Sequence, residues 1–285
     1  MYDDYDLICV LGPTACGKTK YAVKLALDLD GEILSADSRQ VYRGMDIGTG
    51  KDLCDYAAVP YHLIDIVDAG TKYNIFEYQR DFEKAYKSVI DRGKRAILCG
   101  GSGLYIEAAT CRYSLPEVSP DPELRAQLDQ LDTEELIARF EKIRKPHNNT
   151  DYDSRKRLVR ALEIATYEDK HPVTRSAFLP KKTKYIGLSV SREVRNMRID
   201  SRLKARLEEG MIDEVKGLLD RGIAPEDIIY YGLEYKFVTM YLTGQLSFEE
   251  MYSQLAIAIH QFAKRQMTWF RGMERRGIEI EWINI

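Results

Sequence analysis

The sequence lacks long apolar segments, an excess of charge of one sign, and internal repeats. No run is long and apolar enough to span a bilayer. The acidic segment Met1–Asp6 is unlike the start of a signal peptide. A net charge of −3 over 285 residues gives no overall attraction to nucleic acid or to an acidic surface. We therefore expect a cytoplasmic protein that does not interact with membranes.

Cysteines are few and follow no pattern. There is no C-x-x-C pair and no metal-ligand spacing among the five, which are Cys9, Cys16, Cys54, Cys99 and Cys111. An odd number of unpatterned thiols is typical of a reducing compartment rather than of a disulfide framework. Hydrophobic residues make up 45% of the chain and charged residues 31%, as in soluble globular proteins.

A glycine-rich loop near the N-terminus is the first motif that indicates chemistry. It has the form G-x-x-x-x-G-K-[ST] and consists of Gly12, Pro13, Thr14, Ala15, Cys16, Gly17, Lys18 and Thr19. A predicted strand, Leu7–Leu11, precedes it, and a predicted helix, Tyr21–Leu29, follows it. Backbone N–H groups and the helix N-terminus attract phosphate there. Lys18 can neutralise phosphate oxygens, and Thr19 can contact a phosphate or its Mg²⁺.

The first third of the chain predicts an α/β fold. Short apolar runs at Ile33–Ala36, His62–Val67 and Arg95–Cys99 read as further strands, and Asn74–Arg92 has the spacing of a helix. Strands that alternate with helices predict a parallel sheet flanked by helices, here a P-loop-containing core. Ligands of such sheets bind at the carboxyl ends of the strands.

The pattern changes after Arg112. Prolines mark the boundary, and the following segment is helical and highly charged. A strand at Tyr185–Val190 then returns to the sheet, and Arg195–Arg271 is helical. We expect a core domain of residues 1–113 and 184–285 and a helical insertion domain of residues 114–183, with a break near Pro146–Asn149.

One acidic residue follows a predicted strand, at a position where it could take part in a reaction at the glycine-rich loop. The predicted strand that ends at Cys99 has no acidic residue at its end, unlike the magnesium-binding strand of a P-loop NTPase. Asp37 does follow a strand. It could coordinate metal, act as a general base, or simply cap a helix or turn. Asp65 is a second candidate, for which a structural role is favoured.

Basic residues concentrate in and around the insertion. Arg155–Arg160 contains four cations in six residues. At helical spacing Lys156 shares a face with Arg160, and so does Arg157. A solvated helix face explains any one of these residues, but their concentration indicates a phosphate backbone as partner.

Six segments together resemble one family, the tRNA dimethylallyltransferases, also called tRNA isopentenyltransferases. They follow the family's order over nearly the whole chain: Gly12–Thr19, Ser35–Lys51, Pro60–Asp65, Gly100–Tyr105, Arg157–Glu163 and Lys264–Arg271. The block Ser35–Lys51 is far more specific than the loop. The resemblance implies that the helical insertion binds the anticodon stem-loop of a tRNA.

The resemblance also implies a reaction. The loop would hold the diphosphate of dimethylallyl diphosphate, with Mg²⁺ at Thr19. The acceptor would be N6 of the adenosine next to the anticodon, and Asp37 would be the general base. Lys18, Thr19 and Mg²⁺ would stabilise the departing diphosphate. The implied tRNA contacts are Asp37, Ser38, Arg39, Gln40, Ser102, Lys156, Arg157, Leu158, Val159 and Arg160. We expect the enzyme to be a monomer.

Alternatives remain at this stage. An adenylate isopentenyltransferase, which prenylates free AMP, would share the loop and Asp37 but would have little use for a basic insertion. A P-loop nucleotide kinase or another ATP-binding NTPase would need the missing strand-end carboxylate. A non-catalytic RNA-binding relative is a third possibility. It is kept open by Ile228–Tyr235, which matches the family loosely, because many members have a basic residue where Ile229 stands.

Overall fold

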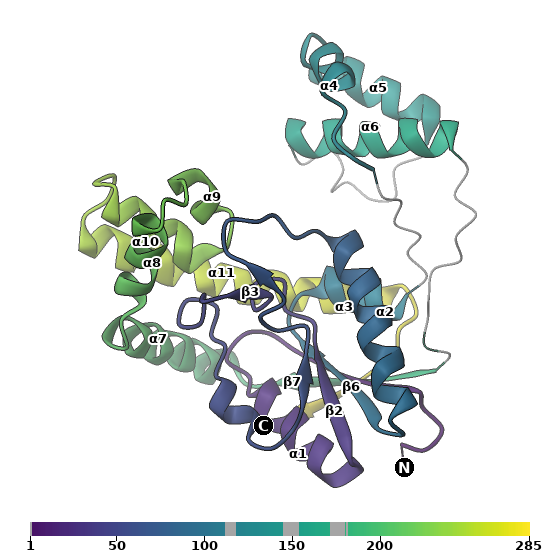
Figure 1. Cartoon of the computed structure of the whole chain (residues 1–285), viewed down its shortest axis with the longest axis vertical. Coiled ribbons are helices and arrows are strands. Elements are labelled where there is room, and N and C mark those ends of the chain that lie inside the picture. The colour runs from purple at the N-terminus through teal and green to yellow at the C-terminus, as the bar shows by residue number, and fades with distance from the viewer. Residues whose placement is uncertain (1, 112–117, 145–153, 172–179, 181) are drawn as a thin grey trace. The chain divides into compact units, whose positions relative to one another are not determined.

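The computed structural model describes residues 2–111, 118–144, 154–171, 180 and 182–285 (Figure 1). The chain forms two compact units, and each is described by itself. One unit comprises Met1–Arg112 and Phe178–Ile285, and the other is Tyr113–Ala177. The sequence predicted 114–183 for the second unit. The first unit contains the sheet and the glycine-rich loop Gly12–Thr19, which is called the phosphate loop below. We call the first unit the core unit and the second the helical unit.

The core unit is built on a six-stranded sheet in which all neighbouring strands are parallel. The strands, in spatial order, are β4 (Tyr61–His62), β2 (Gly31–Ser35), β6 (Arg95–Gly100), β1 (Leu7–Leu11), β7 (Thr183–Ser189) and β8 (Ile280–Asn284). Residues of β1 and β2 are buried throughout, as expected of parallel strands covered on both faces. Leu11 lies opposite Gly100, and Ser35 opposite Cys99, so three adjacent strands end at one edge.

Helices cover both faces of this sheet (Figure 1). Alternate residues of β1, including Ile8 and Val10, pack against α1 (Lys18–Leu29). The other face carries α2 (Ile75–Asp91) and α3 (Gly103–Thr110). Asn74 caps α2 with a capping box, which explains why this helix begins where its spacing predicted. The parallel sheet flanked by helices confirms the predicted fold class.

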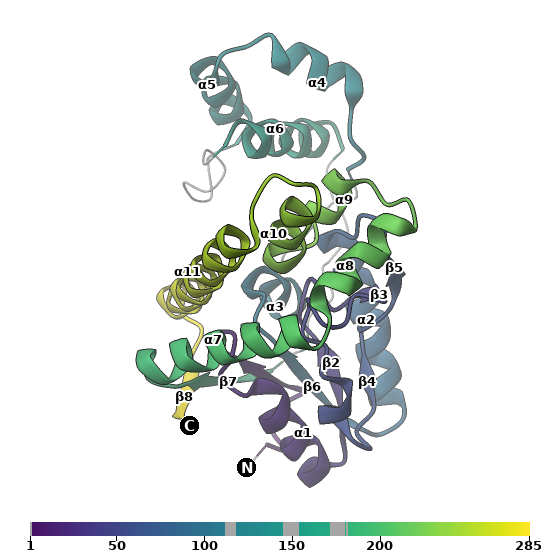
Figure 2. The ribbon, with the colours of Figure 1, turned by 90° about the vertical axis from the view of Figure 1, so that its left-hand side faces the viewer.

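Five helices fill the stretch predicted to be helical, and they lie together beside the sheet (Figure 2). They are α7 (Arg192–Glu208), α8 (Met211–Asp220), α9 (Pro225–Ile229), α10 (Leu233–Leu242) and α11 (Phe248–Arg275). Strand β8 follows them and was not predicted. It pairs with β7, and its Trp282 packs over Gly187.

The strand predicted at His62–Val67 is wrong. The segment divides into β4 and the separate β5 (Val67–Asp68), which pairs with β3 (Tyr42–Arg43), a second strand pair that the sequence did not reveal. Leu63 and Asp65 between them have positive φ angles of 65° and 54°. This turn brings the Asp65 carboxylate to the fully buried amine of Lys51, so a buried charge overrides the apolar pattern. The expected structural role of Asp65 fits this contact. A short 3₁₀ helix, η1 (Leu53–Tyr56), lies between β3 and β4 in the sequence.

In the described part of the helical unit, three helices pack around an apolar core of their own. These are α4 (Pro122–Asp129), α5 (Thr133–Ile143) and α6 (Arg155–Lys170). Their buried side chains include Leu128, Leu136, Phe140, Leu158, Val159 and Leu162. The break expected near Pro146–Asn149 lies outside the described residues.

One buried carboxylate joins α4 to α6. The side chain of Glu163 is 1% exposed and accepts two hydrogen bonds from Arg125, at 2.7 and 2.8 Å. It also accepts from Arg160 at 3.0 Å and from the Asp121 N–H at 3.0 Å. Burial by itself raises the pKa of Glu163, but these donors outweigh it and hold the pKa below its ordinary value.

We predict that Glu163→Gln loosens the helical unit. Each lost charged hydrogen bond is worth about 1.5–3 kcal/mol, so amide protection in α4 and α6 should fall measurably by hydrogen exchange. Because the folded pKa is lowered, the carboxylate stabilises the unit above about pH 4.3, and this stabilisation is lost as pH falls through the folded pKa. The variant should lack that acid-dependent component.

The matched control is Glu168→Gln on the same helix. Its carboxylate is 26% exposed and binds Arg144 at 2.9 Å, so its replacement should cost much less. Equal protection in the wild type and the Glu163 variant would contradict this account of the unit.

Candidate active site

Three loops leave adjacent strand ends, and the middle one, after β6, lies against the other two. The phosphate loop Gly12–Thr19 follows β1, Asp37–Gln40 follows β2, and Gly101–Ser102 follows β6. The approach is close because Gly100 lies against the backbone of Ala36, where a Cβ would overlap it. The Ser102 N–H also donates to the Ala36 carbonyl at 3.3 Å. The predicted site residues of the core unit therefore gather at one edge of the sheet.

The phosphate loop presents an uncapped helix end. Gly17, with φ 78°, directly precedes α1, whose N-terminus has no side-chain cap and whose first turn has no acidic residue. Its N–H groups are thus left for an anion. Gly12 is needed at the start of the loop, since a Cβ there would lie 2.5 Å from the Leu188 carbonyl oxygen. The Lys18 amine donates to the Pro13 carbonyl at 2.7 Å, so this cation lies over its own loop. Thr19 is in the first turn of α1.

Among the described residues, the Asp37 carboxylate is hydrogen-bonded through only one of its two oxygens. Its Oδ1 accepts the Arg39 N–H at 2.9 Å, and its own N–H donates to the Ser35 hydroxyl at 3.3 Å. No donor from the described part of the chain contacts Oδ2. The carboxylate therefore has a turn-forming oxygen and an oxygen that can accept a proton. Both the structural and the functional interpretation of Asp37 are compatible with this geometry.

The residues next to Asp37 have partners from distant parts of the chain. The Ser38 N–H donates to the Ser102 hydroxyl at 3.2 Å, which links the β2 and β6 loops. The Arg39 guanidinium lies 5.5 Å from the centre of the Tyr230 ring, a cation–π contact. The Gln40 amide donates to the Gly50 carbonyl at 3.2 Å. The loosely matching segment at 228–235 thus lies against the site.

A neutral thiol occupies the strand end where an NTPase would have its carboxylate. Burial is the main reason that the pKa of Cys99 is raised to about 12; Lys18 opposes the rise, and Cys16 and Asp37 add to it. Glu234, which the sequence did not single out, is also within electrostatic range of Asp37. Burial raises the pKa of Glu234, and Arg202 and Arg39 oppose that rise. The end of β6 therefore carries no carboxylate that would compete with an anion for the loop.

Helix α11 contributes a residue that sequence reasoning missed. The Oε1 atom of Gln266 accepts the Thr14 N–H at 2.8 Å, and its Nε2 donates to the Gly101 carbonyl at 2.9 Å. The only signal was its place in Lys264–Arg271, a block that carried the resemblance but had no role for this residue. Trp269 stands in the same block. It lies against Gly103 and donates to Glu107 at 2.8 Å.

The remaining predicted RNA contacts belong to the helical unit. Lys156 and Arg157 are exposed on α6. The side chains of Leu158 and Val159 face the unit's apolar core. Arg160 is half-buried and bonded to Glu163 and to the Val118 carbonyl. Lys156 and Arg157 are therefore accessible to solvent, and Arg160 is less so.

Within the described residues no three His, Cys, Asp or Glu side chains come together as a metal site. Mg²⁺ commonly binds through one or two protein oxygens together with substrate phosphates and water. The Thr19 hydroxyl at the phosphate loop fits that mode and not an all-protein site. None of the described helices is both long and apolar enough to cross a membrane.

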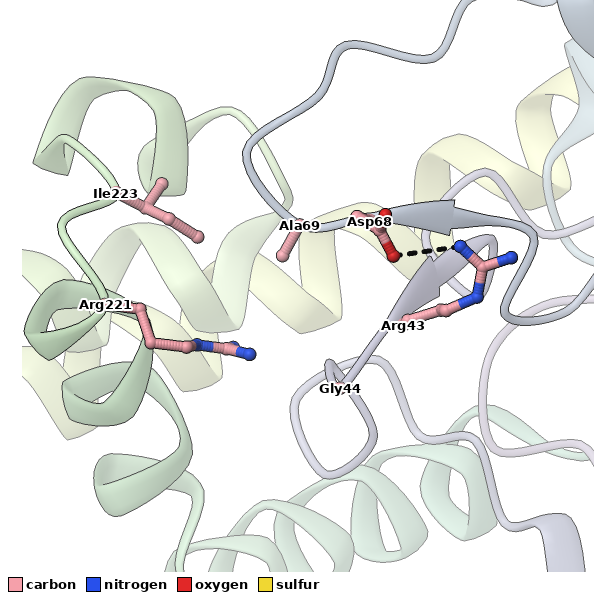
Figure 3. A pocket seen from close by; sticks show the side chains of 6 residues that line it. All are labelled: Arg43, Gly44, Asp68, Ala69, Arg221 and Ile223. Carbon is pink, nitrogen blue, oxygen red and sulfur yellow. Dashed lines mark hydrogen bonds and ion pairs between the residues drawn. The ribbon is translucent and has the colours of Figure 1, made fainter.

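A separate cavity of about 320 Å³ lies between the β3–β5 pair and the end of α8 (Figure 3). It is lined by Arg43, Gly44, Asp68, Ala69, Arg221 and Ile223. Arg43 pairs with Asp68 at 2.9 Å. None of the predicted site residues lines it.

Comparison with known proteins identifies the family. The family model for IPP transferases matches residues 40–273. The chain is 58% identical over 282 residues to tRNA dimethylallyltransferase 2 of Porphyromonas gingivalis, covering 98% of this chain and 93% of that protein. The chain belongs to the tRNA dimethylallyltransferase family. It is therefore a transferase, as the resemblance implied.

Solved structures agree with this family. The full-length tRNA isopentenylpyrophosphate transferase of Bacillus halodurans is 35% identical and superimposes with a TM-score of 0.72, covering 98% of this chain and 90% of that one. A eukaryotic dimethylallyltransferase that acts on tRNA is 23% identical, with a TM-score of 0.80 over 98% of this chain and 73% of that one. The latter likeness supports the fold.

We predict that Lys18→Met weakens binding of inorganic diphosphate about ten- to hundredfold, because a charge-assisted hydrogen bond to the anion is lost. Isothermal titration calorimetry measures this directly. Lys24→Met is the control, because Lys24 is exposed on the same helix beyond its first turn. Equal losses in both variants would show that the loop is not the anion site.

Proposed function

We propose that this protein transfers a dimethylallyl group from dimethylallyl diphosphate to N6 of the adenosine next to the anticodon in tRNA. The observation that carries the proposal is the meeting of two groups at adjacent strand ends. One is a phosphate loop with an uncapped helix terminus, and the other is Asp37 with an oxygen free to accept a proton. Family membership supplies the class of donor and acceptor.

In the proposed reaction, N6 of the adenine attacks the allylic carbon of the donor. The bond between that carbon and the diphosphate oxygen breaks, and the electron pair leaves with the diphosphate. The N6 proton passes to Oδ2 of Asp37. The loop N–H groups, the first turn of α1 and Lys18 face the charge that develops on the leaving group. Mg²⁺, held by Thr19 and the diphosphate, would neutralise part of that charge.

The acceptor base must leave the stacked anticodon loop to reach Asp37, which costs a few kcal/mol. Ser38, Arg39 and Gln40 follow Asp37 directly, and Ser102 lies against Ser38. We expect these residues to contact the extruded nucleotide. Lys156 and Arg157 of the helical unit would contact the phosphates of the stem. The neutral Cys99 at the β6 strand end accords with a donor diphosphate rather than with a nucleoside triphosphate.

The setting proposed for this reaction is the cytoplasm. All five cysteines are free thiols, which suits a reducing compartment. We propose that the enzyme acts as a monomer.

We predict that Asp37→Asn lowers turnover about 10²- to 10⁴-fold, the usual contribution of a general base. Asparagine retains the side-chain oxygen that accepts the Arg39 N–H, so the loop should keep its shape. The affinity for a stem-loop RNA and for diphosphate should therefore change little. Single-turnover transfer to an adenosine-bearing anticodon stem-loop measures the chemical step.

Asp68→Asn is the control, because this carboxylate is 77% exposed and pairs with Arg43 away from the loop. The control should keep wild-type turnover. Full activity of the Asp37 variant would remove Asp37 from the reaction. A wild-type protein that binds the RNA and transfers nothing would identify a non-catalytic relative.

A further inference from the structure

Gln266 is the one side chain among the described residues that hydrogen-bonds the phosphate loop from α11. It is buried, with 7% of its surface exposed. A buried primary amide is costly unless its oxygen and nitrogen are both bonded. Here Oε1 takes the Thr14 N–H at 2.8 Å and Nε2 gives a hydrogen bond to the Gly101 carbonyl at 2.9 Å.

The backbone is shaped around this amide. A Cβ on Gly101 would lie 2.5 Å from the Gln266 Nε2 atom and 3.3 Å from the Gly12 carbonyl oxygen. Only glycine leaves room for the glutamine between the two loops. The amide thus fills the space where the loops after β1 and β6 come together.

Further hydrogen bonds link the Gln266 contact to the loop of Asp37, the proposed general base. Gly101 is followed by Ser102, whose hydroxyl accepts the Ser38 N–H at 3.2 Å, and Ser38 follows Asp37. A chain of hydrogen bonds therefore runs from the phosphate loop through Gln266 and the β6 loop to the β2 loop. Each of its links joins backbone to a side chain, so it transmits position rather than charge.

The helix that carries Gln266 is itself fixed one turn further on. Trp269 donates to one oxygen of the buried Glu107 carboxylate at 2.8 Å, and Arg276 donates to the other at 2.6 Å. Glu107 lies on α3, which begins directly after Ser102. Helix α11 is therefore anchored to α3, the helix that directly follows the β6 loop, while Gln266 contacts that loop itself.

We propose that Gln266 is a positioning residue that sets the spacing between the phosphate loop and the β2 loop, which carries the proposed general base Asp37. The inference rests on the proposed function. Gln266 does not itself touch the reacting atoms. By taking up the Thr14 N–H it fixes the direction of that peptide, so that the remaining N–H groups of the loop converge on the anion. Transfer rates depend steeply on such placement, since small errors in a near-attack geometry are costly.

The test replaces Gln266 by methionine, which keeps a similar volume and removes both hydrogen bonds. Gln261→Met, at an exposed glutamine of the same helix, is the matched control. Three quantities are measured: the Kd for inorganic diphosphate with Mg²⁺, the Kd for an anticodon stem-loop RNA, and the single-turnover transfer rate. We expect the variant's diphosphate Kd to rise about tenfold and its transfer rate to fall at least as much. The RNA Kd should stay the same, and the control should match the wild type.

A second variant approaches the same contact from the other side. Gly101→Ala would place a methyl group against the Gln266 amide and should displace it. If the contact is what matters, the two changes combined should cost little more than either alone, as in a double-mutant cycle of interacting residues. Additive losses would overturn the proposal, because they would show two independent defects.

The outcomes separate the inference from the proposed function. Wild-type protein that neither binds diphosphate nor transfers the group would refute the proposed function. Active wild type with an unchanged Gln266→Met variant would refute the positioning role alone. Tighter diphosphate binding by that variant would also refute it, because Gln266 would then compete with the anion for the Thr14 N–H.

Discussion

The parallel register of β2, β6 and β1 is the constraint on which the site depends. Because these three neighbouring strands end at one edge, the loops that follow them are brought together although they are far apart in sequence. Glycine at positions 100 and 101 then permits backbone contact between the loops, with Ala36 on one side and the Gln266 amide on the other. Side chains from a helix more than 160 residues away complete the arrangement, as the bond from Gln266 to Gly101 shows.

The charges at this edge are divided between two tasks. On the β1 side, Lys18 and the uncapped start of α1 provide positive potential, which would suit the diphosphate of the proposed reaction, and the buried Cys99 thiol adds no negative charge. On the β2 side, Asp37 keeps one oxygen free while the other shapes its turn. An anion and a proton acceptor can therefore be held close together, as a transfer that expels diphosphate and releases a proton requires.

Local patterns predicted most of this arrangement, and long-range contacts account for what they missed. The strand at Leu7–Leu11 and the helix that starts after Asn74 were both predicted from apolar spacing, and the capping box at Asn74 is what the structure adds. The strand predicted at His62–Val67 failed because the buried amine of Lys51 requires Asp65 in a turn, which apolar periodicity does not reveal. Gln266 was missed for a similar reason: its partners Thr14 and Gly101 become visible only when α11 packs against the loops. In the helical unit, the basic stretch was found, but its pattern did not show that Arg160 is paired internally.

The central claim is that the phosphate loop holds the donor of a group that is transferred to a base in RNA. The most direct measurement follows label from dimethylallyl diphosphate when an adenosine-bearing anticodon stem-loop RNA and free AMP are offered together with Mg²⁺. The account predicts that label enters the RNA alone and that it is found at N6 of the adenosine next to the anticodon. Label in AMP alone would contradict it, because Asp37 and the loop would then serve a free nucleotide.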